Sequence, residues 1–102
     1  MAIMEINIIP IGTASPSVGE HLIRALKVLK VSGMKYELTS MATIVEGELE
    51  ELFQVAKKMH SATFSHGIKR VVTTVKIDER EDKVSSMEEK VKQVKEKFEF
   101  SG

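Results

Sequence analysis

Apolar and polar residues alternate with two different periods along the chain, and the changes of period divide it into short segments. Alternation over residues 2–11 ("AIMEINIIPI") predicts a strand. Both faces of this strand carry apolar residues, which is typical of a strand covered on two sides. A stripe at helical spacing over residues 15–33 then predicts an amphipathic helix, which Ser15 caps and Gly33 ends.

The middle of the chain repeats this order. Residues 34–40 and 41–47 predict two short strands joined by a tight turn near Ser40. Residues 48–67 predict a second helix that ends at Gly67. An apolar stripe lies along one side of this helix, and we expect His60 to be at the edge of the core. The residues of the stripe are Leu49, Phe53, Ala56, His60 and Phe64.

The last third predicts one more strand and one more helix. Residues 69–78 alternate like a strand, with Val71, Thr73, Val75 and Ile77 on one face. After a charged link, apolar residues step by 3, 4, 3 and 4 positions, as in the narrow seam of a helix that packs on another element. These residues are Val84, Met87, Val91, Val94 and Phe98.

The predicted order is therefore β-α-β-β-α-β followed by a C-terminal helix. Two helices over one face of a four-stranded antiparallel sheet form a ferredoxin-like α+β sandwich, here one domain over residues 1–102. The other sheet face is left partly apolar and uncovered, and such faces commonly bind a partner. We expect a homodimer or homotetramer built through this face, the C-terminal helix or both. Alternatively, the last helix folds back on its own sheet.

Composition narrows the function classes. Lys plus Arg and Asp plus Glu each number 15 in 102 residues, so no net charge favours nucleic acid or an anionic membrane. Tyr36 is the only aromatic residue in a predicted strand, which argues against base stacking. The chain has no cysteine and no apolar run near 18 residues, so we expect a cytoplasmic protein without disulfides or thiolate chemistry.

Signatures of catalysis and of metal binding are missing from the sequence. His21, His60 and His66 have no H-x-x-x-H or H-E-x-x-H spacing, and the acidic link at residues 78–83 lacks the spacing of a calcium loop. There is no G-x-S-x-G turn. We therefore expect no enzyme, no metal and no cofactor, and the histidines give little support to a small oxygenase.

Three stretches carry a family resemblance when they are taken together. They are "PIGTASPSV", "YELTSMATIVEGE" and "RVVTTVKIDERED", at residues 10–18, 36–48 and 70–82. The chain resembles the small thiamine-binding protein family from Ile6 to Val94. The resemblance implies a ferredoxin-like subunit, sheet-to-sheet dimers that pair into tetramers, and binding of thiamine or a related pyrimidine without catalysis.

A thiamine site needs an apolar slot for flat rings, a few fixed polar groups and an acceptor near the cation. If the strand at 41–47 runs beside the first strand, Met41 and Thr43 approach Ile9 and Ile11. As hypotheses, Ile11 and Met41 pack on the ring faces. Thr13 and Ser17, which follow the first strand, orient the pyrimidine together with Thr43.

In the same hypothesis, Glu46 accepts a hydrogen bond from an amino group of thiamine or balances the positive charge of thiamine. Each residue also has a purely structural explanation: Ser17 as a helix cap, Thr43 as a residue that favours a strand, and Glu46 as a solvated strand end. His21 departs from the residue, often aromatic, that the family favours at this position, so specificity could differ here.

Two other function classes fit the same order of elements. One is an allosteric module of the amino-acid-binding ACT type, although such modules are usually fused to an enzyme domain. The other is a purely structural oligomerisation protein without a small-molecule ligand. Titration with thiamine and with amino acids separates the three.

Overall fold

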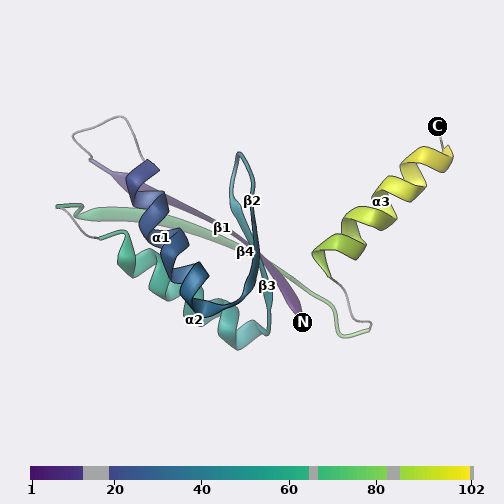
Figure 1. Cartoon of the computed structure of the whole chain (residues 1–102), viewed down its shortest axis with the longest axis horizontal. Coiled ribbons are helices and arrows are strands. Elements are labelled where there is room, and N and C mark those ends of the chain that lie inside the picture. Colours follow the sequence, from purple (N-terminus) through teal and green to yellow (C-terminus); the bar gives the residue numbers. More distant parts are fainter. Residues whose placement is uncertain (13–18, 65–66, 83–85, 102) are drawn as a thin grey trace.

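The first strand lies in the middle of a four-stranded antiparallel sheet, and two helices cover one face of that sheet (Figure 1). The computed structural model describes residues 1–12, 19–64, 67–82 and 86–101. Its elements are β1 Ala2–Ile11, α1 Gly19–Ser32, β2 Lys35–Leu38, β3 Thr43–Gly47, α2 Leu49–Ala62, β4 Arg70–Glu79 and α3 Met87–Ser101. This confirms the predicted ferredoxin-like α+β order with an added C-terminal helix.

The two neighbours of β1 differ in length. The sheet has the order β2-β3-β1-β4, and β4 pairs with β1 from Ala2 to Ile11. β3 pairs with β1 only from Ala2 to Ile6. The second half of β1, from Asn7 to Ile11, therefore has a paired strand on one side only within the described chain.

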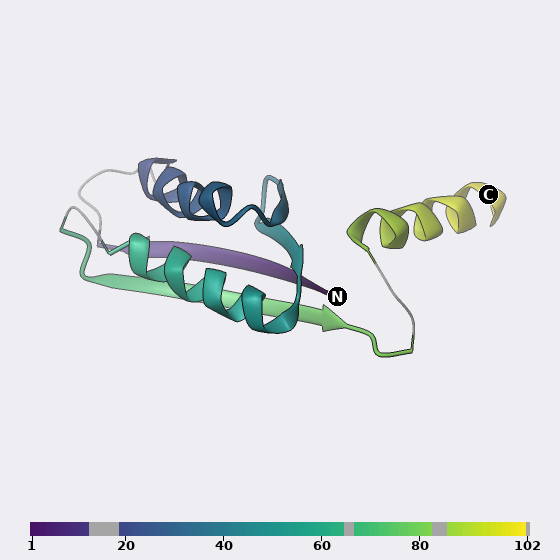
Figure 2. The same cartoon turned by 60° about the horizontal axis from the view of Figure 1, so that its bottom comes forward.

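The core lies between the sheet and the helices α1 and α2 (Figure 2). The even-numbered residues of β1 face these helices, and Met4 is 0% exposed. The buried apolar residues of this core are Ala2, Met4, Ile6, Ala25, Leu29, Val45, Leu52, Val55, Ala56 and Met59. Gly33 follows α1 with a φ of 74°, the left-handed conformation that was predicted for it.

Of the apolar stripe predicted for α2, only Ala56 enters the buried core, and His60 lies at its margin. The core contacts come from Leu52, Val55, Ala56 and Met59, whereas Phe53 is 56% exposed. Both stripes have helical spacing, so the pattern alone did not distinguish them. The helix also ends at Ala62, earlier than the predicted Gly67. At this end, the Thr63 hydroxyl donates a hydrogen bond to the Met59 carbonyl oxygen at 3.0 Å.

Only the beginning of α3 contacts the sheet, on the face opposite α1 and α2. Met87 is buried there, and Lys90 donates a hydrogen bond to Asp78 of β4. Lys35 of β2 forms an ion pair with Glu88 at 2.7 Å. Farther along, Val94 and other apolar residues of α3 are exposed, and the helix stands away from the rest of the molecule (Figure 1). The alternative in which the last helix folds back on its own sheet thus holds only for its first turns.

None of the described helices combines the length and the apolar character that crossing a membrane requires.

Candidate functional site

A cavity lies beside the part of β1 that extends past its pairing with β3 and is paired with β4 only. Its volume is about 230 Å³, and its walls are residues 6–10 of β1, Leu22 of α1 and residues 38–43 of the β2–β3 hairpin. We call it the hairpin cavity. It exists because the pairing of β3 with β1 reaches only Thr43 opposite Ile6, where the chain enters the turn at residues 39–42, while β1 extends to Ile11.

Thr39 holds the turn that forms one wall of the hairpin cavity. Its hydroxyl donates to the Ala42 carbonyl oxygen at 2.8 Å and accepts from the Ala42 amide at 3.1 Å. The Met41 amide also donates to this hydroxyl, at 3.3 Å. Across the cavity, the Asn7 side-chain amide donates to the Met41 carbonyl oxygen at 3.3 Å. The turn is therefore tied both to itself and to β1.

The chemistry of the hairpin cavity is apolar with neutral polar groups. Ile8, Leu22 and Met41 offer apolar surface, and Thr39 and Thr43 offer hydroxyls. No charged side chain is among its lining residues in the described chain. Beyond Ile6, the backbone of β1 also has no paired strand on this side among the residues that the structure describes. Backbone N–H and C=O groups need partners when they are shielded from water, so this edge can bind a ligand that supplies them.

Sequence reasoning identified two wall residues of this cavity, Met41 and Thr43. Ile9 lines the same cavity, so the expected approach of Met41 and Thr43 to Ile9 agrees with the structure. Thr43 is buried and pairs with Ile6, so the register lies nearer the start of β1 than expected. Met41 is 80% exposed at the turn. Ile11 lies at the end of β1, outside the cavity walls.

Two further predicted ligand residues, Thr13 and Ser17, lie outside the described residues. Sequence reasoning also missed Thr39 and Asn7, which position the turn. A threonine just before a tight turn is a recognisable signal, because its hydroxyl can bond the backbone two or three residues on.

Glu46 does not lie near the hairpin cavity, contrary to expectation. It pairs with Ile3 near the opposite end of β1 and is three residues from Thr43, so the two side chains point to opposite faces of the sheet. Its carboxylate is 6% exposed and lies 3.7 Å from the Lys35 ammonium. The Glu88 hydrogen bond, with Coulombic attraction from Glu88 and Glu46, raises the pKa of Lys35. Whether Glu46 contacts a ligand stays a prediction.

The histidines occupy separate positions. His21 of α1 contacts Arg24, and neither residue lines the hairpin cavity. His60 of α2 lies 2.6 Å from the Thr73 hydroxyl of β4, at the margin of the core, as expected. In the described part of the chain, no group of three His, Cys, Asp or Glu side chains is placed to hold a metal ion.

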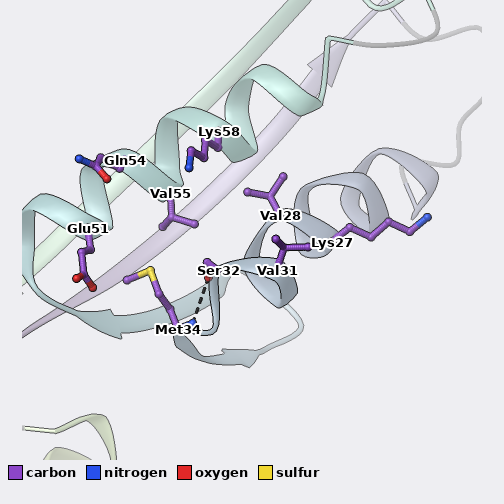
Figure 3. A pocket seen from close by; sticks show the side chains of 9 residues that line it. All are labelled: Lys27, Val28, Val31, Ser32, Met34, Glu51, Gln54, Val55 and Lys58. Carbon is purple, nitrogen blue, oxygen red and sulfur yellow. Dashed lines mark hydrogen bonds between the residues drawn. The ribbon is translucent and has the colours of Figure 1, made fainter.

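A second hollow, of about 690 Å³, lies between α1 and α2 (Figure 3). Val28 and Val31 of α1 face Val55 of α2 across it, with Glu51 toward one end and Lys58 toward the other. Val31 is 88% exposed, so this hollow is an open surface groove. Among the predicted ligand residues that the structure describes, none lines it.

Comparison with known proteins agrees with the fold. The family model described as thiamine-binding protein matches residues 4–95. UPF0045 protein YqgV of Bacillus subtilis is 43% identical over 98 residues, covering 92% of this chain and 94% of that protein. A UPF0045 protein of Methanothermobacter thermautotrophicus is 40% identical over 99 residues, covering 96% of this chain and 100% of its own length.

Two solved structures extend the likeness. Protein MJ1052 of Methanocaldococcus jannaschii has a TM-score of 0.85 and 37% identity, covering 93% of this chain and 96% of that chain. A Thermotoga maritima protein to which thiamine biosynthesis or salvage has been ascribed has a TM-score of 0.78 and 29% identity, covering 91% and 97%. The match of the family model over most of the chain, together with these relatives, shows that the chain belongs to the thiamine-binding protein family.

Proposed function

We propose that this protein binds thiamine, or the pyrimidine part of thiamine, without catalysis and as a homo-oligomer that serves as a carrier, buffer or sensor. Family membership supports a binding role. The observation that carries the proposal is the hairpin cavity, an apolar space beside the edge of β1. Within the described part of the chain, no charged side chain lines this space and no strand pairs with that edge. An aminopyrimidine suits such a space because it is flat, neutral and able both to donate and to accept hydrogen bonds.

The ligand would complete the open edge of β1. Every second residue from Asn7 to Pro10 points its backbone donor and acceptor away from the paired strand β4 and toward the cavity, although Pro10 has only a carbonyl oxygen. The amino group of the pyrimidine would donate to a strand carbonyl, and a ring nitrogen would accept from a strand amide. Ile8, Leu22 and Met41 would pack on the ring.

The positive thiazolium ring would point out of the cavity. No carboxylate lines the cavity in the described chain, and burying an unpaired cation costs several kcal/mol or more. Much of the affinity should therefore come from the pyrimidine half. The amino-acid-binding alternative is less well supported, because a buried α-ammonium group would need an acceptor of opposite charge in the same place.

Exposed apolar surface supports self-association. The sheet face opposite α1 and α2 exposes Ile9, Ile11 and Val72, and α3 exposes Val94 and Phe98. We propose that further copies of the chain cover these surfaces, as a dimer or a tetramer.

Isothermal titration of ligand-stripped protein tests the binding proposal. Thiamine and its free pyrimidine moiety should both give saturable heat, while the thiazole moiety and a panel of amino acids should give none. Leu22→Ala and Met41→Ala should each weaken binding about tenfold, which corresponds to loss of about 1.4 kcal/mol of ring packing. Thr43→Val tests the hydroxyl with little change in volume.

Glu46→Gln is the informative control, because Glu46 lies on the other sheet face. Unchanged affinity would support the hairpin cavity, and a large loss would move the site to the Glu46 face. Heat with an amino acid alone would favour the regulatory module, and no heat at all would favour the oligomerisation protein. Thiamine recovered chemically unchanged after incubation would agree with binding without catalysis.

A further inference from the structure

The groove between α1 and α2 is apolar along its middle and charged at its two ends. Val28 and Val31 of α1 and Val55 of α2 form its apolar part (Figure 3). Val55 is 3% exposed and forms the floor, whereas Val31 is 88% exposed on the wall. An apolar strip that runs from a buried floor to an exposed wall is typical of a surface that a partner covers.

The charged side chains of the groove are divided between its ends. Glu51 lies toward the end where α1 finishes and α2 begins, and Lys58 lies toward the other end. Seven residues separate them, a rise of about 10 Å along α2, so they cannot pair with each other. Both are exposed, and within the described part of the chain neither forms an ion pair. Both charges are therefore available to a partner.

These features select the class of partner. A fatty acid or another anionic amphiphile suits Lys58, but its apolar tail would lie against Glu51. An anionic membrane is disfavoured by the same carboxylate, since membrane-binding surfaces are rich in Lys and Arg. An added strand needs an exposed backbone edge, whereas the walls of this groove are side chains of two helices. A helix needs only side-chain contacts, and its positions i, i+3, i+4 and i+7 share one face.

A helix of suitable sequence can meet the apolar strip and both charges at once. An acidic residue at position i would pair with Lys58, and a basic residue at i+7 would pair with Glu51, because seven residues have the same rise on both helices. Apolar residues at i+3 and i+4 would pack between these charges, on Val28, Val31 and Val55. α1 and α2 have 14 residues each, so each wall is about 21 Å long and accommodates this segment.

We propose that the groove between α1 and α2 binds an amphipathic helix of another protein, which carries an acidic and a basic residue seven positions apart with apolar residues between them. Helix α3 of a second copy is a poorer match, because its Glu88 already pairs with Lys35 and its Met87 is buried. Among the described residues, none lines both this groove and the hairpin cavity, so the proposal does not depend on the thiamine site.

Binding of fluorescent helical peptides to the full chain, measured by anisotropy, tests the charge pattern. Three alanine-based peptides of equal length carry E-x-x-L-L-x-x-K, E-x-x-L-L-x-x-E or K-x-x-L-L-x-x-K. The parent chain should bind the mixed-charge peptide about tenfold more tightly than the other two, since each of those places a like charge beside Glu51 or Lys58. Glu51→Lys should shift the preference to the peptide with two glutamates, and Lys58→Glu to the peptide with two lysines. Equal binding of the three peptides, no binding of any, or variants without these shifts would overturn the proposal.

A matched pair of variants on α1 tests the apolar strip. Val31→Asp should abolish binding of the mixed-charge peptide, while Ile23→Asp, at an exposed residue outside the groove, should leave it unchanged. Both positions are more than half exposed, so both variants should fold. A changed oligomeric state of Val31→Asp in sedimentation velocity, with Ile23→Asp unchanged, would assign the groove to a second copy. Binding of the parent chain to vesicles of anionic lipid, lost in Val31→Asp, would assign it to a membrane. Either result would overturn the proposal.

Discussion

The two halves of β1 have similar sequences and different surroundings. From Ala2 to Ile6 the strand has a neighbour on each side, the core on one face and the start of α3 on the other. From Asn7 to Ile11 it has β4 alone, and Ile9 is 48% exposed. The first half contributes stability, and the second half leaves backbone and apolar surface available for a ligand. Functional surface here arises where a neighbouring strand stops.

The largest expected difference between the halves is in stability. Met4→Ala should lower the free energy of unfolding by about 3 kcal/mol, because Met4 is fully buried and the change leaves a cavity. Ile9→Ala should cost less than about 1 kcal/mol. Urea denaturation at low protein concentration measures both. Equal losses would show that the second half of β1 is covered in solution, for example by another copy.

The second largest expected effect concerns the contact between the start of α3 and the first half of β1. Met87→Ala should speed hydrogen exchange in the first turn of α3 and destabilise the chain by about 1–2 kcal/mol, since Met87 is the buried contact of this helix. Phe98→Ala is the matched control on the exposed part of the same stripe. An equal effect of Phe98→Ala would mean that the whole stripe is buried in an assembly.

A substitution in the wall of the hairpin cavity tests whether the second half of β1 belongs to a ligand site. Thr39→Val removes the hydroxyl that bonds Met41 and Ala42, and should cost about 1 kcal/mol of stability. Thiamine affinity should fall with it, because the turn loses its fixed position. Ser40→Ala is the control, as it alters an exposed neighbour within the same turn. If both variants bind thiamine like the parent chain, the turn is not part of the ligand site.

The smallest expected effect is the pH dependence of the α3 attachment. The Lys90 hydrogen bond lowers the pKa of Asp78 from its usual 3.8, with Coulombic attraction from Lys90 as the next cause. A lowered pKa means that this contribution is present above pH 3.8 and is lost as the pH falls through the folded-state value. The protection of α3 amides, measured relative to their unprotected exchange rate at each pH, should therefore fall at the acid end of a pH series. Asp78→Asn should remove that part of the pH dependence, and an unchanged profile would contradict the assignment.

Most of the fold could be predicted because the period of apolar residues and the residues that end helices and form turns are local properties of the sequence. The strand at Ala2–Ile11 and the turn at Gly33 follow from neighbours a few residues away, and both agree with the structure. The candidate site could be predicted only in part. Met41 and Thr43 lie in the cavity wall, whereas Glu46 lies on the other face, and the period of a strand already separates positions 43 and 46.

By itself, then, the sequence determined the order of elements, the family and the α+β class, because these depend on residue period and on motifs along the chain. The tertiary structure decided which of two helical stripes of α2 enters the core, where β3 stops along β1, and which end of the sheet α3 covers. Those outcomes depend on how elements distant in sequence pack and pair. Leu52 and Phe53 belong to two stripes of α2 that both have helical spacing. The position of the sheet buries Leu52 and leaves Phe53 exposed.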